Sequence, residues 1–273
     1  MDWSGHHTEV IRTWLALAVL CAGTARGAGP SYSAAGIVNA SNYTAGPFAP
    51  NSVLSVFGTG LARSAHALVD SDLVACPASL AGRCLPTEMN YVRVYVQERP
   101  VPLLFVAEGQ VNFIMSSEES TGPVKVRVVT EGITGPEITV MLVDAAPALF
   151  AIPGGSYVIA TDAKGNLLTA EAPAHTGDTV VVYVTGLGRT SPNPAVGEIP
   201  NYAATMLAIA SLKLTLNGKA VAPWDIKYAG VTPGSAGLYQ INLYLPEGTG
   251  NDPEIQVTAG NLTAQTGLKL PLR

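Results

Sequence analysis

A repeat inside the chain constrains its fold more than any other feature. The segment 56–61 (VFGTGL) returns as 182–187 (VYVTGL), and 110–113 (QVNF) returns as 240–243 (QINL). Both motifs recur in the same order after roughly 126 to 130 residues, so chance is a poor explanation. The sequence therefore predicts two copies of one unit of about 110 to 120 residues, the size of a single β-sandwich domain.

Short apolar runs separated by turn residues predict β-structure in both copies. Runs rich in Val, Ile, Leu, Tyr and Thr alternate with clusters of Gly, Pro, Asn and Asp at intervals of about ten residues. Hydrophobic residues make up 48% of the chain, which favours two stacked sheets per copy. We expect sandwich domains at 28–146 and 147–273, and one helical turn near 202–210. The expected strands are 52–58, 91–97, 101–107, 110–115, 123–130, 136–143, 156–161, 178–185, 211–217, 224–229, 237–245, 253–259 and 264–270.

The first thirty residues have the pattern of an export signal. A polar start ends at Arg12, an apolar run covers 14–22, and the small residues Ala25 and Gly27 precede a cleavage site. The apolar run has about half the length that a membrane-spanning helix needs. Residues 1–27 are therefore predicted to be a signal peptide. The remaining chain is expected to be secreted or at the cell surface, in an extracellular or periplasmic location, with no membrane insertion after signal cleavage.

Cysteine usage fits such a compartment. Cys21 lies in the predicted signal peptide, which leaves Cys76 and Cys84 as an even pair with seven residues between them. In an oxidising compartment this pair predicts a local disulfide. Closing so short a loop is worth about 2 to 3 kcal/mol by the loop-entropy model.

Five groups of residues carry a resemblance to a known family. They are 37–43 (IVNASNY) with 49–61 (APNSVLSVFGTGL), 102–113 with PLLFV and GQVNF, 146–150 (APALF), 177–188 with GD and YVTGLG, and 228–242 with YAG and GLYQIN. From about residue 35 to the end, this succession resembles the Solibacter-type uncharacterised C-terminal domain family. The resemblance implies sandwiches similar to IPT/TIG domains, in exported bacterial proteins. The expected fold class is all-β, a tandem of two immunoglobulin-like β-sandwich domains related by an internal repeat.

Charge and motif content argue against several kinds of chemistry. The 15 basic and 20 acidic residues give a net charge of −5, which argues against a nucleic-acid partner. The segment 162–166 (DAKGN) contains Lys164 and lacks the further carboxylates of a calcium loop, so a hairpin turn is expected there. His175 is expected in a solvated turn, and no Gly-x-Ser-x-Gly motif occurs. We expect no metal, no cofactor and no catalytic residues.

Two alternatives to a simple binding module stay open. Glycoside hydrolysis uses two facing carboxylates, and Glu118 with Glu119, or Asp70 with Asp72, lie in loops that offer such groups. A secreted hydrolase that uses these loop carboxylates is the first alternative. The second is a structural subunit that pairs exposed strand edges with another chain.

The duplicated Gln-x-Asn motif is the most distinctive polar feature. Residues i and i+2 share one face of a strand, so Gln110 and Asn112 should point away from the core, as should Gln240, Asn242 and Tyr244. One interpretation is a sugar-binding platform, in which the tyrosine ring stacks on a sugar and the amides bind hydroxyl groups. The other is that amides repeated in both copies stabilise the fold.

These observations favour one function over its alternatives. We expect a secreted, non-catalytic β-sandwich module for extracellular adhesion or recognition, with an extracellular polysaccharide or a surface protein as its ligand. Trp224, the only tryptophan after the predicted signal peptide, is expected to pack in the core or at the domain seam.

Overall fold

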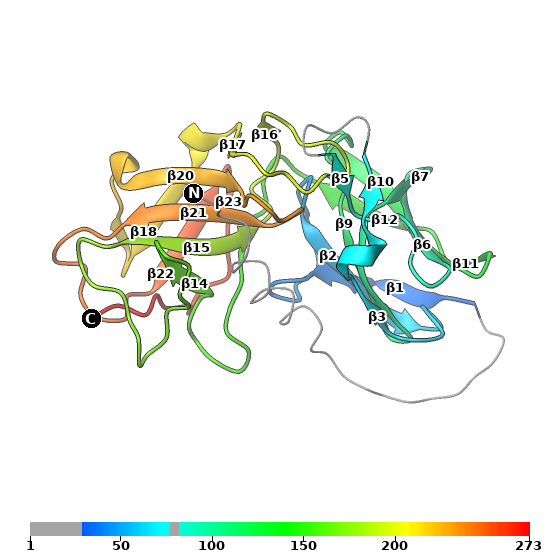
Figure 1. The fold of residues 1–273 in the computed structure, drawn as a ribbon, viewed down its shortest axis with the longest axis horizontal. Helices are drawn as coiled ribbons and strands as arrows, with labels where there is room; N and C mark the ends of the chain where they lie inside the picture. The colour runs from blue at the N-terminus through cyan, green and yellow to red at the C-terminus, as the bar shows by residue number, and fades with distance from the viewer. Residues whose placement is uncertain (1–28, 77–81) are drawn as a thin grey trace.

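The computed structural model of the protein describes residues 29–76 and 82–273 (Figure 1). These residues form β-strands and three short 3-10 turns, and the described part of the chain contains no α-helix. Accordingly, no helix within it has the length and apolar character to cross a membrane. The predicted signal peptide at 1–27 lies outside the described residues. The prediction of an all-β fold is confirmed.

The N-terminal half forms two antiparallel sheets. The first has the strand order β1-β2-β9-β8-β3, and the second has the order β11-β10-β6-β7 with β12 also paired to β10. The elements of this half are β1 (Ser31–Asn39), β2 (Val53–Thr59), β3 (His66–Ala67), η1 (Asp70–Asp72), β4 (Val74–Ala75), β5 (Arg83–Cys84), β6 (Val92–Val96), β7 (Arg99–Val101), β8 (Leu103–Ala107), β9 (Gln110–Ile114), β10 (Gly122–Thr130), β11 (Ile133–Thr134) and β12 (Ile138–Leu142). Strands β4 and β5 form a separate hairpin.

The C-terminal half repeats this plan beside the first (Figure 1). Its larger sheet has the order β13-β15-β21-β20-β17-β16 with β14 also paired to β15, and its smaller sheet has the order β19-β18-β22-β23. The elements are β13 (Ala148–Leu149), β14 (Ala160–Asp162), β15 (Thr179–Thr185), β16 (Thr190–Ser191), β17 (Ala204–Met206), η2 (Ile209–Ser211), β18 (Lys213–Leu216), β19 (Lys219–Ala220), η3 (Pro223–Asp225), β20 (Ile226–Val231), β21 (Tyr239–Tyr244), β22 (Ile255–Ala259) and β23 (Leu262–Thr263).

Each half buries its own hydrophobic core. Alternate residues along the strands, such as Val111 and Phe113 on β9, are completely buried between the two sheets of the first half. The core of the first half extends to Leu142, whereas that of the second half begins at Ala145. Two separate cores define a tandem of two sandwiches. The gap between the cores lies beside the predicted domain boundary after residue 146.

The repeated motifs occupy equivalent positions in the two sandwiches. Phe57 on β2 pairs with Gln110 on β9, and Tyr183 on β15 pairs with Gln240 on β21. Both pairs of strands are antiparallel and lie in the interior of one sheet of each half. The internal repeat of the sequence therefore corresponds to a repeat of the central strand pair.

The structure differs from the expected elements in several places, of which three are instructive. Residues 264–270 form no strand, because Lys269 donates to Ser156 whereas Leu270 donates to Pro253, so the segment changes partner from one residue to the next. The strand expected from residue 224 begins at Ile226, since a 3-10 turn precedes it. The long strand β1 was not expected, because its Ser, Ala and Gly residues have low strand propensity.

Direct hydrogen bonds join the two sandwiches. Arg189 of the second sandwich donates from Nε to the carbonyl of Ser117 at 3.1 Å, and its terminal nitrogen donates to the carbonyl of Glu119. The backbone N–H of Val53 donates to the Thr185 hydroxyl at 3.1 Å. In each contact, a side chain of the second sandwich bonds to a backbone carbonyl or N–H group of the first. They form a domain seam with specific geometry.

The predicted disulfide between Cys76 and Cys84 is present, and it lies at this seam. The cysteines close the β4–β5 hairpin, with their Cα atoms 5.3 Å apart. Cys84 forms an isolated bridge with Glu198 of the second sandwich, and the N–H of the next residue, Leu85, donates to Gly197 at 2.8 Å. The disulfide therefore stabilises a hairpin that extends as a short pairing across the domain boundary.

Removing the Arg189 side chain should weaken the seam. We expect Arg189→Ala to lower the free energy of unfolding by about 1.5 to 3 kcal/mol, because two carbonyls lose a charged donor. Urea denaturation measures this change. Arg63→Ala is the control, since its ion pair with Glu131 is exposed and should be worth less than about 1 kcal/mol. Equal effects of the two variants would contradict the assigned role of Arg189.

Breaking the disulfide should destabilise the same region. The double variant Cys76→Ala/Cys84→Ala is expected to lose about 2 to 3 kcal/mol of stability, because the unfolded chain regains the entropy of an open loop. The same denaturation experiment in dithiothreitol should lower the stability of the parent protein by a similar amount and leave the variant unchanged. A variant as stable as the oxidised parent would refute this expectation.

Candidate functional site

The two Gln-x-Asn motifs are built in the same way. In β9, Gln110 Nε2 donates to Asn112 Oδ1 at 2.8 Å, and in β21, Gln240 Nε2 donates to Asn242 Oδ1 at 2.8 Å. The predicted face is correct in both strands, because each pair lies opposite the core residues of its strand. In each sandwich, one amide therefore orients the other.

The pair in the first sandwich is closed to ligands. Gln110 is 5% exposed and Asn112 is 1% exposed, and the Ser55 hydroxyl donates to Asn112 Oδ1 at 2.8 Å. Buried polar groups with several hydrogen bonds are expensive to disrupt. The burial of Gln110 and Asn112 thus supports the interpretation that this copy of the motif stabilises the fold.

The pair in the second sandwich lies at the border between a covered and an open region. Phe150, Ile159 and Leu238 pack with Val181 and Tyr183 in a small cluster that covers one part of the outer sheet face. Gln240, which pairs with Tyr183, is 5% exposed as a result. Asn242 and Tyr244 continue along β21 beyond the cluster, and both are only partly buried.

A β-bulge brings a lysine to this open region. The pairing of β20 with β21 shifts register between Ile226 and Tyr228, so Lys227 is an extra residue. Its ammonium nitrogen lies 5.2 Å from the centre of the Tyr244 ring and donates to the Trp224 carbonyl at 2.8 Å. We call Trp224, Lys227, Asn242 and Tyr244 the β21 platform.

Trp224 differs from its sequence-based expectation. Packing in the core or at the domain seam was predicted, but Trp224 is 76% exposed. The cause is local: Pro223 starts the 3-10 turn Pro223–Asp225, which carries the tryptophan before the strand and its alternation of faces begin. Tryptophan is enriched at binding interfaces, because it combines a large apolar surface with an N–H donor.

The Asn242 side chain keeps hydrogen-bonding capacity for a ligand. Its Oδ1 accepts from Gln240, whereas its Nδ2 group supplies two donors that can reach a ligand. The motif itself predicted Asn242 and Tyr244 from the sequence. Trp224 and Lys227 were missed as site residues, because a bulge and a 3-10 turn bring them there. Pro223, directly before Trp224, was the sequence signal for the turn that exposes the tryptophan.

The loop carboxylates of the hydrolase alternative have structural contacts. Glu118 forms an ion pair with Arg99 at 2.8 Å, and the Glu119 backbone belongs to the domain seam. Asp72 accepts from the backbone N–H of Val69 and contacts His66 Nε2 at 2.9 Å. These hydrogen bonds and ion pairs account for the positions of the carboxylates in both loops.

The Asp162 loop and His175 form turns, as expected. Asp162 accepts from the backbone N–H groups of Lys164 and Asn166 and from the Asn166 side chain. Burial opposes ionisation of Asp162, but these hydrogen bonds outweigh it and lower its pKa. His175 is exposed and its backbone N–H donates to Asp178. Within 29–76 and 82–273, no three His, Cys, Asp or Glu residues are placed to hold a metal ion.

A small cavity lies at the domain seam. Its walls include Asn51 and Ile114 of the first sandwich and Glu198 and Gly237 of the second. The buried Glu198 carboxylate accepts from the N–H of Ala195 and from the hydroxyl of Tyr202. Burial and the bond to this carboxylate raise the pKa of Tyr202 to about 12. The carboxylate thus holds the turn that lines the cavity.

The edge strand β1 is relevant to the alternative of a structural subunit that pairs exposed strand edges with another chain. Its register against β2 shifts between Tyr32 and Ile37, which interrupts the regular edge. The Tyr32 hydroxyl accepts from the N–H of Val128 at 2.7 Å and donates to the carbonyl of Pro136 at 2.6 Å. Irregular edges of this kind oppose pairing with another chain.

The similarities of the chain to known proteins are distant. No family model and no curated protein matches the chain. Similar solved structures include a gamma-CGTase from alkalophilic Bacillus clarkii, with 12% identity over 92% of this chain and 28% of that chain and a TM-score of 0.29. Another is SGBP-B from a mixed-linkage glucan utilization locus of Bacteroides ovatus, with 10% identity, 82% and 44% coverage, and a TM-score of 0.30. The tandem Ig repeats of Dlar match with 10% identity, 90% and 95% coverage, and a TM-score of 0.21.

These likenesses concern the fold alone. The chain spans less than half of the length of the Bacillus and Bacteroides ovatus proteins. The strand pairings and the two separate cores show an all-β tandem of two β-sandwiches, which agrees with the predicted all-β tandem fold. Membership of the Solibacter-type family stays a prediction.

The two copies of the amide motif should respond differently to the same substitution. We expect Asn112→Ala to cost about 2 to 3 kcal/mol of stability, because Ser55 and Gln110 both lose a buried acceptor. Asn242→Ala should cost less than about 1 kcal/mol, since Asn242 is partly exposed and accepts from Gln240. Thermal and urea denaturation of both variants measure the difference. Equal losses would show that the two copies have the same structural role.

Proposed function

We propose that the protein is an extracellular, non-catalytic recognition module that binds a polysaccharide at the β21 platform. The observation that supports this function best is that Trp224, which is 76% exposed, is linked through its backbone carbonyl and Lys227 to Tyr244 on a partly open sheet face. Binding sites usually join an apolar or aromatic surface to a few fixed polar groups. Trp224 supplies the aromatic surface, and Asn242 supplies oriented amide donors.

The chemistry of sugars fits this surface. One face of a pyranose ring is mostly C–H and packs on an aromatic ring, while its hydroxyl groups need hydrogen-bond partners. Gln240 holds Asn242 in one orientation, so the amide loses little freedom when it binds a hydroxyl. The other partner expected from the sequence, a surface protein, would usually contact about 20 to 30 residues of the chain, whereas the platform comprises four.

The aromatic residues of the platform should dominate binding. On a glycan array followed by titration of the best polymer, we expect Trp224→Ala and Tyr244→Ala each to weaken binding by about tenfold or more. Trp224→Ala removes the stacking surface, and Tyr244→Ala removes the ring that holds Lys227.

Tyr91→Ala is the matched control for the loss of an exposed aromatic residue. Tyr91 is 73% exposed and lies in the first sandwich, so this variant should bind like the parent protein. Circular dichroism establishes that all three variants fold. The proposal fails when no glycan binds the parent protein, or when Tyr91→Ala weakens binding as much as Trp224→Ala.

A further inference from the structure

We propose that the polysaccharide is anionic, and that Lys227 recognises its carboxylate or sulfate groups. This inference rests on the proposed function and adds the charge of the ligand to it. Lys227 is the one cation of the β21 platform, and both of its contacts are with neutral groups, the Trp224 carbonyl and the Tyr244 ring.

The position of the Lys227 ammonium group is fixed before a ligand binds. The bulge at 226–228 determines where the side chain leaves the strand, and the Trp224 carbonyl and Tyr244 ring hold its end. A surface lysine normally samples many rotamers, and fixing them costs free energy when a ligand binds. The two contacts of Lys227 already restrict its rotamers, so less conformational entropy is lost when an anion binds. The two N–H donors that do not bond to Trp224 are available to an anion.

Several other cations of the protein form ion pairs with carboxylates, whereas Lys227 forms none with any residue that the structure describes. Lys125 forms an ion pair with Glu137 at 2.7 Å, and Arg99 forms one with Glu118 at 2.8 Å. Across the part of the chain that the structure describes, no carboxylate lies within 4.0 Å of Lys227 Nζ. A ligand anion therefore does not have to displace a carboxylate of the protein.

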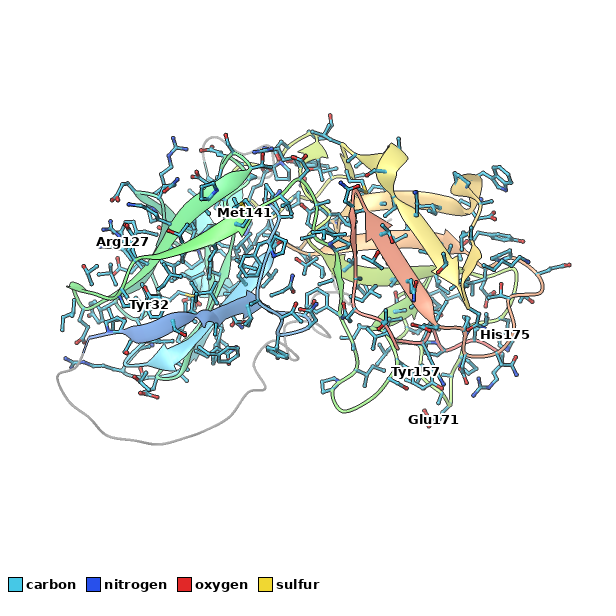
Figure 2. All side chains as sticks on the ribbon, turned by 180° about the vertical axis from the view of Figure 1, so that it is seen from behind. Tyr32, Arg127, Met141, Tyr157, Glu171 and His175 are labelled. Atoms are coloured by element: carbon cyan, nitrogen blue, oxygen red, sulfur yellow. A yellow bond between two sulfur atoms is a disulfide. The ribbon has the colours of Figure 1, made fainter. Side chains whose placement is uncertain are left out.

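The first sandwich contains an internal comparison. Arg127, labelled in Figure 2, lies over the Tyr95 ring with its guanidinium carbon 4.8 Å from the ring centre. This pair resembles Lys227 and Tyr244, except that Arg127 also forms an ion pair with Glu98 at 2.7 Å. Both sandwiches thus place a cation on a tyrosine ring, and only the platform leaves that cation without a counter-ion.

The acidic character of the whole protein does not oppose such a ligand at short range. The net charge is −5, but charges further than about 8 Å away are largely screened at physiological ionic strength. Lys227 is then the charged group of the platform that a ligand would contact directly. Binding should consequently weaken as the salt concentration rises, as expected for a contact between exposed charges.

The test compares three polymers and three variants by titration at low and physiological salt. The polymers are polygalacturonate, which carries carboxylates, chondroitin sulfate, which also carries sulfates, and neutral mixed-linkage glucan. We expect an anionic polymer to bind more tightly than the glucan, and Lys227→Gln to weaken that binding about fivefold or more. Lys227→Gln should change the binding of the neutral glucan less than that of the anionic polymers. Arg127→Gln, the matched control, should bind every polymer like the parent protein.

The outcomes separate this inference from the proposed function. A preference for chondroitin sulfate over polygalacturonate would identify sulfate as the recognised group, and the reverse would identify the carboxylate. If Lys227→Gln binds both anionic polymers like the parent protein while Trp224→Ala loses binding, the inference is wrong and the proposed function stands. If Trp224→Ala and Lys227→Gln both bind like the parent protein, neither the inference nor the platform assignment survives.

Discussion

The antiparallel pairing of two central strands is the constraint on which each sandwich depends. Pairing β2 with β9, and β15 with β21, sets which residues face the core and which face outward. A shift of one residue would exchange the two faces and expose the apolar set. In the first sandwich an outward amide stabilises this register, because Asn112 on β9 accepts from the hydroxyl of Ser55, the residue that pairs with it on β2. In both sandwiches the amide motif lies on the strand pair that defines the register.

Function is expected where the two copies differ, and they differ in what covers the outer face of the central pair. In the first sandwich the amides are almost completely buried. In the second, a small apolar cluster covers the face as far as Gln240 and leaves Asn242 and Tyr244 partly open. The bulge in β20 then adds a cation to the open part. The same outward sheet face is therefore closed in the first sandwich and partly open in the second, because the segments next to it differ.

Much of this fold, and less of the site, could be predicted from the sequence. Periodic apolar runs and the repeat predicted the strands of the central pairs, and the cysteine spacing predicted the disulfide. Strand β1 was missed because its stability comes from pairing with β2 and not from its own residues. Buried Asn112 accepts a hydrogen bond from Ser55, a residue 57 positions away, and no local sequence pattern predicts such a contact. Trp224 was placed wrongly because a 3-10 turn interrupts the alternation that the strand pattern assumed.

The platform and the domain seam lie at opposite ends of the same strands, which makes them independent. Strand β15 runs from Thr179, which pairs with Tyr244, to Thr185, whose hydroxyl accepts from the N–H of Val53 across the seam. At about 3.3 Å per residue, the two ends are separated by about 20 Å. Sites more than about 10 Å apart with no shared partners contribute almost additively. The contacts with the first sandwich and the disulfide therefore stabilise the tandem at one end of these strands. A long polymer bound at the other end, as proposed, would not contact the seam.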